Sequence, residues 1–303
     1  MSPVPIFLDT DIGGDIDDTW ALAFLLNCPE LKLEYALTCV PVTSYRAKVV
    51  AKLFQWANNT ETPIGMGIES TSAIFPGPCP KRQASWIEEV DLKNVPNPVV
   101  EDGVKDFVEK IMAYPDTPTI VAIGPLVNIA KALEIEPAIA EKCRIVILGG
   151  SVRIGYFGQS TPSREYNIVY SPEAAQKVFT APWKETVVVP LDTCGYIYLD
   201  GPDYQKLRES DAPMAKAVIE NYQMWRHEET RNFEQRSSLL CDTVPVGLAF
   251  DESWCIFEEL PLRVTDEGDT VIDEVNGKMC RVATDWKDLP GFKHFLSQRL
   301  LKK

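Results

Sequence analysis

The feature that most constrains this chain is the stretch FLDTDIGGDIDD, residues 7–18, which holds five aspartates between Asp9 and Asp18. An apolar run precedes it and a helical pattern, TWALAFLL, follows it, so the carboxylates are crowded where a strand passes into a helix. Like charges held close together are costly unless a positive group joins them. Helix capping accounts for one or two of the aspartates. The others predict a bound hard cation such as Ca²⁺ or Mg²⁺, which prefers oxygen ligands.

Apolar runs and helical patterns alternate along the chain. This order predicts the α/β class, with a single domain over residues 1–303 and a mostly parallel, Rossmann-like central sheet flanked by helices. Ligands of such sheets bind at the carboxyl ends of the strands. We expect strands at residues 4–8, 33–40, 63–68, 119–124, 144–150 and 185–191, and a hairpin at 262–275. We expect helices from about residue 17 and at 44–59, 101–114, 125–135, 171–179, 212–227, 238–250 and 289–301, and a long loop at 69–100.

Composition narrows the class of partner. The net charge of −14 argues against nucleic acid and anionic membranes, which reward basic surfaces. No stretch approaches the roughly 20 apolar residues of a membrane helix, and the first residues lack the pattern of a secretory signal. The eight cysteines form no CxxC pair, so we expect reduced thiols and a cytoplasmic location.

The start of the chain leaves one enzymatic alternative open. FLDTDIG also resembles the strand-end DxD of haloacid-dehalogenase-type phosphatases, in which the first aspartate is a nucleophile and Mg²⁺ holds the phosphate. In that alternative Asp9 would be the nucleophile. The doubled aspartates Asp17 and Asp18 are not part of that pattern.

Four separated stretches together resemble the inosine–uridine-preferring nucleoside hydrolases. They are DTDIGGDIDDTWAL, which has two residues more than the DxDxGxDD signature of the family, then VAIGPLVNIAKALEIEPAI, then ILGGS followed by EYNIVYSPEAAQKVF, and LLCDTVPVGLAFD. They occur in the family's order over nearly the whole chain. The resemblance implies hydrolysis of a ribonucleoside, or a similar N-riboside, to ribose and free base.

The resemblance also implies a set of site residues. Ca²⁺ would be bound by Asp11, Asp18, Asp242 and the backbone carbonyl of Ile123. Asp17, Glu165 and Asn167 would bind the ribose hydroxyls. Asp11 would take a proton from a water that attacks an oxocarbenium-like transition state. If the EYN segment is extended, Glu165 and Asn167 point to the same side. Without the resemblance, Asp242 and EYN would be ordinary caps or loop residues.

Two positions depart from the family pattern. Thr43 stands near the place of a ribose-binding asparagine, and it cannot offer both donor and acceptor groups of an amide. Cys241 replaces the histidine that acts as leaving-group acid, which places the chain closer to the cysteine-bearing subgroup. These departures keep a third alternative open, a metal-dependent nucleoside- or sugar-binding protein without catalysis.

Other residues are candidates for the base pocket. Tyr166, with Tyr156, Phe157 and Trp225, has the ring needed to stack on a nucleobase, although each also suits a core or loop position. His227 is a candidate for the missing acid, and residues 153–164 for a mobile lid with two glycines. The resemblance implies a homodimer or homotetramer as the assembly.

Overall fold

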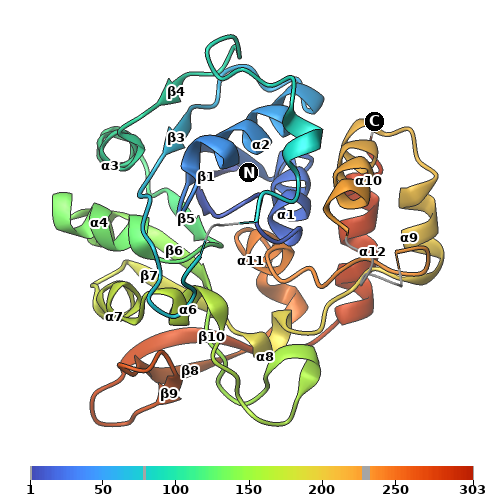
Figure 1. Cartoon of the computed structure of the whole chain (residues 1–303). Coiled ribbons are helices and arrows are strands. Elements are labelled where there is room, and N and C mark those ends of the chain that lie inside the picture. Colours follow the sequence, from blue (N-terminus) through green and yellow to red (C-terminus); the bar gives the residue numbers. More distant parts are fainter. Residues whose placement is uncertain (1, 78–79, 227–232, 303) are drawn as a thin grey trace.

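The protein, described here by a computed structural model over residues 2–77, 80–226 and 233–302, is built on a ten-stranded sheet. The strand order is β4-β3-β2-β1-β5-β6-β7-β10-β8-β9 (Figure 1). Neighbours from β4 to β10 pair in parallel, and β8 and β9 continue the sheet in antiparallel pairs. The strands are β1 (Val4–Thr10), β2 (Leu31–Thr38), β3 (Ile64–Met66), β4 (Val99–Val100), β5 (Thr119–Ala122), β6 (Arg144–Leu148), β7 (Glu185–Val189), β8 (Cys255–Val264), β9 (Thr270–Ile272) and β10 (Lys278–Trp286). The predicted mostly parallel α/β sheet is therefore confirmed.

Helices cover both faces of the sheet (Figure 1). One face carries α1 (Asp17–Leu26), α2 (Thr43–Trp56), α10 (Pro213–Trp225), α11 (Thr243–Leu248) and α12 (Leu289–Leu300). The other carries α3 (Gly103–Ala113), α4 (Val127–Ile135), α5 (Ile139–Lys142) and α7 (Pro172–Thr180). The remaining short helices are η1 (Ala84–Ile87), η2 (Tyr156–Gly158), α6 (Tyr166–Tyr170), α8 (Leu191–Cys194), α9 (Gly201–Arg208) and η3 (Glu252–Trp254).

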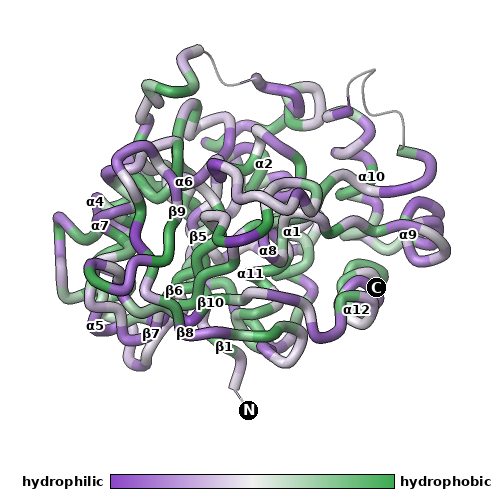
Figure 2. The backbone as a smooth tube through the Cα atoms, turned by 90° about the horizontal axis from the view of Figure 1, so that it is seen from below, coloured by the Kyte–Doolittle hydropathy of each residue, from purple (hydrophilic) through white to green (hydrophobic). Residues whose placement is uncertain are grey.

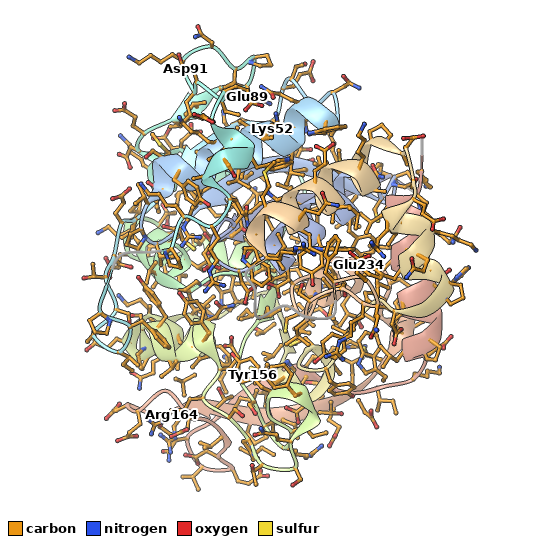
Figure 3. All side chains as sticks on the ribbon, turned by 45° about the vertical axis from the view of Figure 1, so that its right-hand side comes forward. Lys52, Glu89, Asp91, Tyr156, Arg164 and Glu234 are labelled. Carbon is orange, nitrogen blue, oxygen red and sulfur yellow. The ribbon has the colours of Figure 1, made fainter. Side chains whose placement is uncertain are left out.

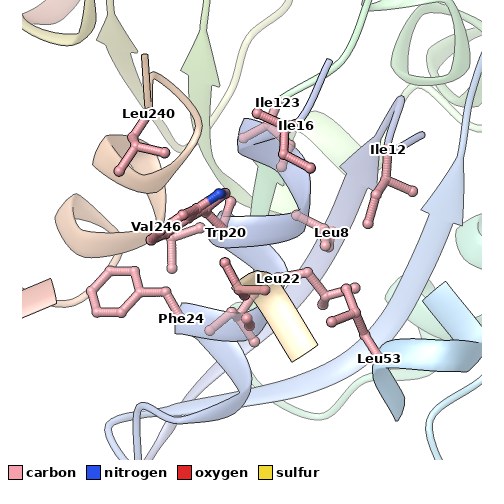
Figure 4. Close-up of a cluster of buried hydrophobic side chains, with 14 of the residues drawn as sticks. Leu8, Ile12, Ile16, Trp20, Leu22, Phe24, Leu53, Ile123, Leu240 and Val246 are labelled. Atoms are coloured by element: carbon pink, nitrogen blue, oxygen red, sulfur yellow. The ribbon is translucent and has the colours of Figure 1, made fainter. Parts of the chain in front are cut away.

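Strand β1 shows how the pattern of the sequence builds the two cores. Ile6 and Leu8 point into one hydrophobic cluster and Phe7 into the other, as the period of two in a strand requires. On the first face, α1 packs against α11, and Trp20 lies near Val246 (Figure 4). The apolar colour follows the central strands, while peripheral segments such as α9 are more polar (Figure 2). The start of α1, which carries the aspartates, is thus fixed by packing.

The structure differs from the sequence-based expectations at several element boundaries. Pro125 was expected to open a helix, but α4 begins at Val127, because the backbone N–H of Val127 bonds to the Pro125 carbonyl in a turn. The helix expected at 238–250 begins only at Thr243. Strand β10 and helix α9 were not predicted. No helix in the described part of the chain combines the length and apolarity needed to cross a bilayer.

Candidate active site

A cavity of about 1290 Å³ opens at the carboxyl ends of the central strands. Its walls include parts of the β1–α1 turn, of residues 71–77 and 80–82, of residues 156–170, and of residues 198–225 and 233–242. Tyr156 borders the open space in the middle of the molecule (Figure 3). The position matches the expectation for a sheet of this class.

The inner end of the cavity is a buried group of carboxylates, which we call the acidic floor: Asp11, Asp17, Asp18 and Asp242. Asp11 follows β1, and Asp17 and Asp18 form the first turn of α1. Asp242 precedes α11, and its side chain makes no capping hydrogen bond to that helix. Residues from both ends of the chain therefore meet at one place.

Three members of the acidic floor are close enough to share one metal ion. Ligand atoms of Asp17, Asp18 and Asp242 all lie within 4.8 Å of one another. This trio contains Asp17, for which the resemblance implies ribose binding. The trio does not contain Asp11, which the resemblance makes a ligand. Asp11 nevertheless lines the same cavity.

Local hydrogen bonds hold the acidic floor in place. The Thr10 hydroxyl donates to Asp18 Oδ1 over 2.5 Å and accepts from the backbone N–H of Ile12. Gly124 leaves room for Asp11, because a Cβ at Gly124 would lie 2.8 Å from the Asp11 nitrogen and 3.1 Å from Asp11 Oδ1. The Ile123–Gly124 backbone therefore runs directly against Asp11.

The electrostatics of the acidic floor call for a cation. Burial raises the pKa of Asp18 well above its usual range, and the Asp11 and Asp17 carboxylates raise it further. Burial and the other three carboxylates act on the pKa of Asp242 in the same way. Burial also raises the pKa of Asp11, while the Arg46 guanidinium opposes that shift. Buried carboxylate oxygens with unbalanced charge are the donor set that hard divalent cations prefer, so these residues fit a metal ion.

Glu165 and Asn167 lie beside the acidic floor, but on a helix start instead of an extended segment. Glu165 is the N-cap of α6, and its carboxylate accepts from the backbone N–H groups of Asn167, Ile168 and Gly150. Burial raises the pKa of Glu165 to about 7, although these N–H groups act to lower it. The Asn167 amide donates to the Ile123 carbonyl over 2.9 Å. Glu165 and Asn167 both line the cavity, although the segment begins a helix and is not the extended segment considered from sequence.

The two residues that depart from the family pattern lie in different places. The backbone N–H and hydroxyl of Thr43 both donate to Glu69, over 2.9 and 3.0 Å, and the described cavity lining does not include Thr43. Cys241 does line the cavity. The neighbouring Cys194 thiol, together with burial, raises the pKa of Cys241 well above its usual range, which favours the neutral thiol.

The mouth of the cavity carries exposed apolar side chains, which we call the aromatic rim: Ile74, Phe75, Phe157 and Tyr166. The Phe75 and Tyr166 rings lie 5.0 Å apart. Tyr156 and Trp225, two further stacking candidates, also line the cavity, and Trp225 Nε1 donates to the Gly14 carbonyl over 3.0 Å. His227, the proposed replacement acid, lies outside the described residues.

Sequence analysis missed two contributors to the cavity. Phe75 comes from the loop at 69–100, whose Pro- and Ser-rich sequence carries no periodic signal. Arg46, on α2, is buried at the cavity wall. From sequence alone, an arginine in such a helix is expected to lie at the surface. Tertiary structure, and not local pattern, brings both to the site.

Asp9, the nucleophile of the phosphatase alternative, is not accessible from the cavity. Its side chain is fully buried, and Oδ1 accepts from the Asn128 amide over 2.8 Å. Burial raises the pKa of Asp9 to about 8, and the Asp11 carboxylate acts in the same direction. The described lining residues do not include Asp9. The geometry therefore offers no support for a phosphatase.

Comparison with known proteins finds relatives that are named as nucleosidases or nucleoside hydrolases. The family model described as inosine-uridine preferring nucleoside hydrolase matches residues 6–294. The probable uridine nucleosidase 2 of Arabidopsis thaliana is 28% identical over 302 residues, which covers 95% of this chain and 91% of that protein. The inosine-uridine preferring nucleoside hydrolase of Crithidia fasciculata is 28% identical, with coverages of 86% and 84%.

Solved structures share the fold at lower sequence identity. A plant nucleoside hydrolase superposes with a TM-score of 0.83 at 24% identity and covers 99% of this chain and 100% of its own. The purine-preferring ribonucleoside hydrolase from Gardnerella vaginalis has a TM-score of 0.81 at 22% identity, with 98% of each chain covered. At these identities the likeness concerns the fold alone.

Proposed function

This chain belongs to the inosine-uridine preferring nucleoside hydrolase family, and on that premise we propose that it uses a Ca²⁺ ion in its acidic floor and Asp11 as general base. Membership makes the chain a hydrolase of the N-glycosidic bond of ribonucleosides. The identity of the ion and the role of each residue are the proposed part.

One observation carries the proposal. Asp242 comes from a segment far along the chain, yet its carboxylate lies with those of Asp17 and Asp18 within 4.8 Å. Buried carboxylates repel one another strongly in a low dielectric, and a bound cation relieves that repulsion while it keeps them ionised. An all-oxygen donor set favours Ca²⁺ over softer metals.

The proposed roles follow the resemblance to the family, and the residues named for them lie at or beside the acidic floor. Asp11, Asp18, Asp242 and the Ile123 carbonyl would hold the ion. When bound, Ca²⁺ would supply a Lewis acid that orients a water molecule and the ribose hydroxyls. Asp11 takes a proton from the attacking water, a contribution of about 10²–10⁴-fold. Asp17, Glu165 and Asn167 bind the ribose, and the carboxylates around it favour the oxocarbenium-like transition state.

The leaving base meets a different set of residues. Tyr166 and its neighbour Phe75 present ring faces at the mouth of the cavity, on which a nucleobase would stack. Cys241 is given no role as an acid, because its pKa is raised and a neutral thiol protonates a base poorly. Thr43 is left out of the ribose site, since both its donors bond to Glu69.

Two further properties belong to the proposal. A homodimer or homotetramer is the proposed assembly, which sedimentation velocity would test. A cytoplasmic location is the proposed compartment, and the seven described cysteines are all free and buried thiols, as a reducing environment allows.

A panel of nucleosides tests the function. Metal-free protein is incubated with inosine, guanosine, adenosine, uridine and cytidine, with and without added Ca²⁺, and ribose is measured as reducing sugar. We expect Ca²⁺-dependent ribose release from at least one nucleoside and no phosphate release from p-nitrophenyl phosphate.

The matched variants are Asp242→Ala and Asp91→Ala. Asp91 is a surface aspartate far from the cavity lining (Figure 3). Asp242→Ala should be inactive and Asp91→Ala fully active. Ribose release that is equal with and without Ca²⁺, or that survives in Asp242→Ala, would count against the proposed metal site.

A further inference from the structure

A buried arginine borders the acidic floor. Arg46 is 2% exposed, belongs to α2, and lines the cavity together with Asp11. Taking a guanidinium out of water costs several kcal/mol unless its charge and its donors are matched. The family signature assigns this residue no role, so its neighbours must indicate what it does.

The guanidinium ties together two turns at the carboxyl ends of neighbouring strands. Nη1 donates to the Ile12 carbonyl over 3.0 Å, in the turn that follows β1. Nε donates to the Val40 carbonyl over 3.3 Å and Nη2 to the Pro41 carbonyl over 3.1 Å, both in the turn that follows β2. The rigid fork of arginine makes these contacts at fixed angles, which a lysine cannot do.

The same side chain forms an ion pair with the proposed general base. Nη1 lies 3.9 Å from Asp11 Oδ2. Asp11 is the residue before Ile12, whose carbonyl the same Nη1 binds. Arg46 therefore holds the backbone next to Asp11 and also places a positive charge beside the Asp11 carboxylate.

Arg46 also alters the charge balance of the acidic floor. The acidic floor holds four carboxylates, and the Arg46 cation reduces their formal charge from −4 to −3. One divalent ion then leaves −1, whereas it would leave −2 without the arginine. A smaller excess charge binds a cation less tightly, because each charge at short range contributes strongly in a buried site.

We propose that Arg46 is a positioning residue that holds Asp11 in place for proton abstraction and, as a fixed internal cation, limits how tightly the acidic floor binds its metal ion. The inference rests on the proposed metal site. It separates two effects of one side chain: orientation raises kcat, and charge weakens metal binding.

Arg144 provides a matched control elsewhere in the sheet. Its guanidinium also binds two backbone carbonyls, those of Ala249 and Leu248, over 2.8 and 3.3 Å. It also pairs with two carboxylates, Glu252 and Glu185. Arg144 begins β6, at the strand end opposite to the cavity, and is not among the described lining residues. A purely structural arginine network can thus be removed for comparison.

The experiment measures Ca²⁺ binding to metal-free protein by isothermal titration calorimetry, together with kcat, KM and melting temperature. Arg46→Met should bind Ca²⁺ about tenfold more tightly than wild type, since one neighbouring charge shifts ionic equilibria by at least that factor. Its kcat should fall about ten- to hundredfold, as expected for a misplaced catalytic group. Arg46→Lys keeps the charge and loses the fork, so it should bind Ca²⁺ like wild type and still lose kcat. Arg144→Met should lower only the melting temperature.

Each outcome decides the inference. Arg46→Met that binds Ca²⁺ with wild-type or weaker affinity overturns the charge effect, and an unchanged kcat overturns the positioning effect. If Arg46→Met does not fold, Arg46→Gln replaces it in the Ca²⁺ titration, and wild-type kcat in Arg46→Lys overturns the positioning effect. Wild-type protein that binds no Ca²⁺ contradicts the proposed metal site itself, which is a distinct result.

Discussion

The acidic floor and the aromatic rim face the same cavity but are built in opposite ways. The four floor carboxylates are at most 9% exposed and stand at the ends of packed elements. The rim side chains are 36–68% exposed and come from loops or short helices. Strand ends and helix starts fix positions closely, whereas loops tolerate variation. We infer that the floor performs chemistry common to the family and the rim selects the base.

Removal of the metal ion should produce the largest effect, and only on the floor. Chelation with EDTA should abolish ribose release, and added Ca²⁺ should restore it, because the carboxylates lose the cation that balances them. Ca²⁺ at a hundred times its Kd should also stabilise the fold by about 2.7 kcal/mol. Scanning calorimetry of metal-free and loaded protein checks this shift. If chelation leaves the rate of ribose release unchanged, the proposed metal requirement is wrong.

Asp11→Ala comes next in expected size. The change removes both the proposed general base and a proposed metal ligand, so kcat should fall by at least about 10²–10⁴-fold. The fold should persist, because Asp11 caps no helix. Its removal also relieves repulsion among the buried carboxylates and so stabilises the metal-free protein. Kinetics and a melting curve test both parts, with Asp91→Ala as control. Full activity in Asp11→Ala would show that another group activates the water.

On the rim, Phe75→Ala should raise KM and leave kcat nearly unchanged. A stacked base contributes about 1–3 kcal/mol, so KM should rise roughly five- to 150-fold. Phe75→Leu is the control, because it keeps apolar bulk and removes the ring face. Steady-state kinetics on the best nucleoside of the panel test the change. A fall in kcat as large as that of Asp11→Ala would erase the distinction between floor and rim.

The floor was also far easier to predict from the sequence than the rim. The aspartates lie next to strong periodic patterns, so β1, the start of α1 and the cavity at the strand ends were all predicted correctly. Phe75 lies in a loop without periodicity, and only the fold brings it to within 5.0 Å of Tyr166. Sequence alone could not place such contacts, because loop paths depend on the elements they cross.

Other errors also have physical causes. Strand β10 carries charged residues between its buried ones, so its pattern is weak, and its place is set by pairing with β7 and β8. The EYN segment starts a helix because the Glu165 carboxylate caps it, whereas the expectation that Glu165 and Asn167 point to the same side assumed an extended segment. Arg46 resembles any exposed helix cation until tertiary structure buries it. Local pattern therefore predicts elements well and buried polar networks poorly.

Cys241 lies at the floor and should nevertheless give the smallest effect. The neighbouring Cys194 thiol and burial raise its pKa, so the thiol neither donates a proton readily nor carries charge toward the metal ion. Cys241→Ala should change kcat less than about threefold and mainly lower stability, by the roughly 1 kcal/mol typical of small core truncations. Measured kcat and melting temperature, with Cys255→Ala as a buried control away from the cavity, test this. If Cys241→Ala lost as much kcat as Asp11→Ala without a matching loss of stability, Cys241 would take part in the reaction. A buried neutral thiol in the cavity could then not be assigned to packing from its burial alone.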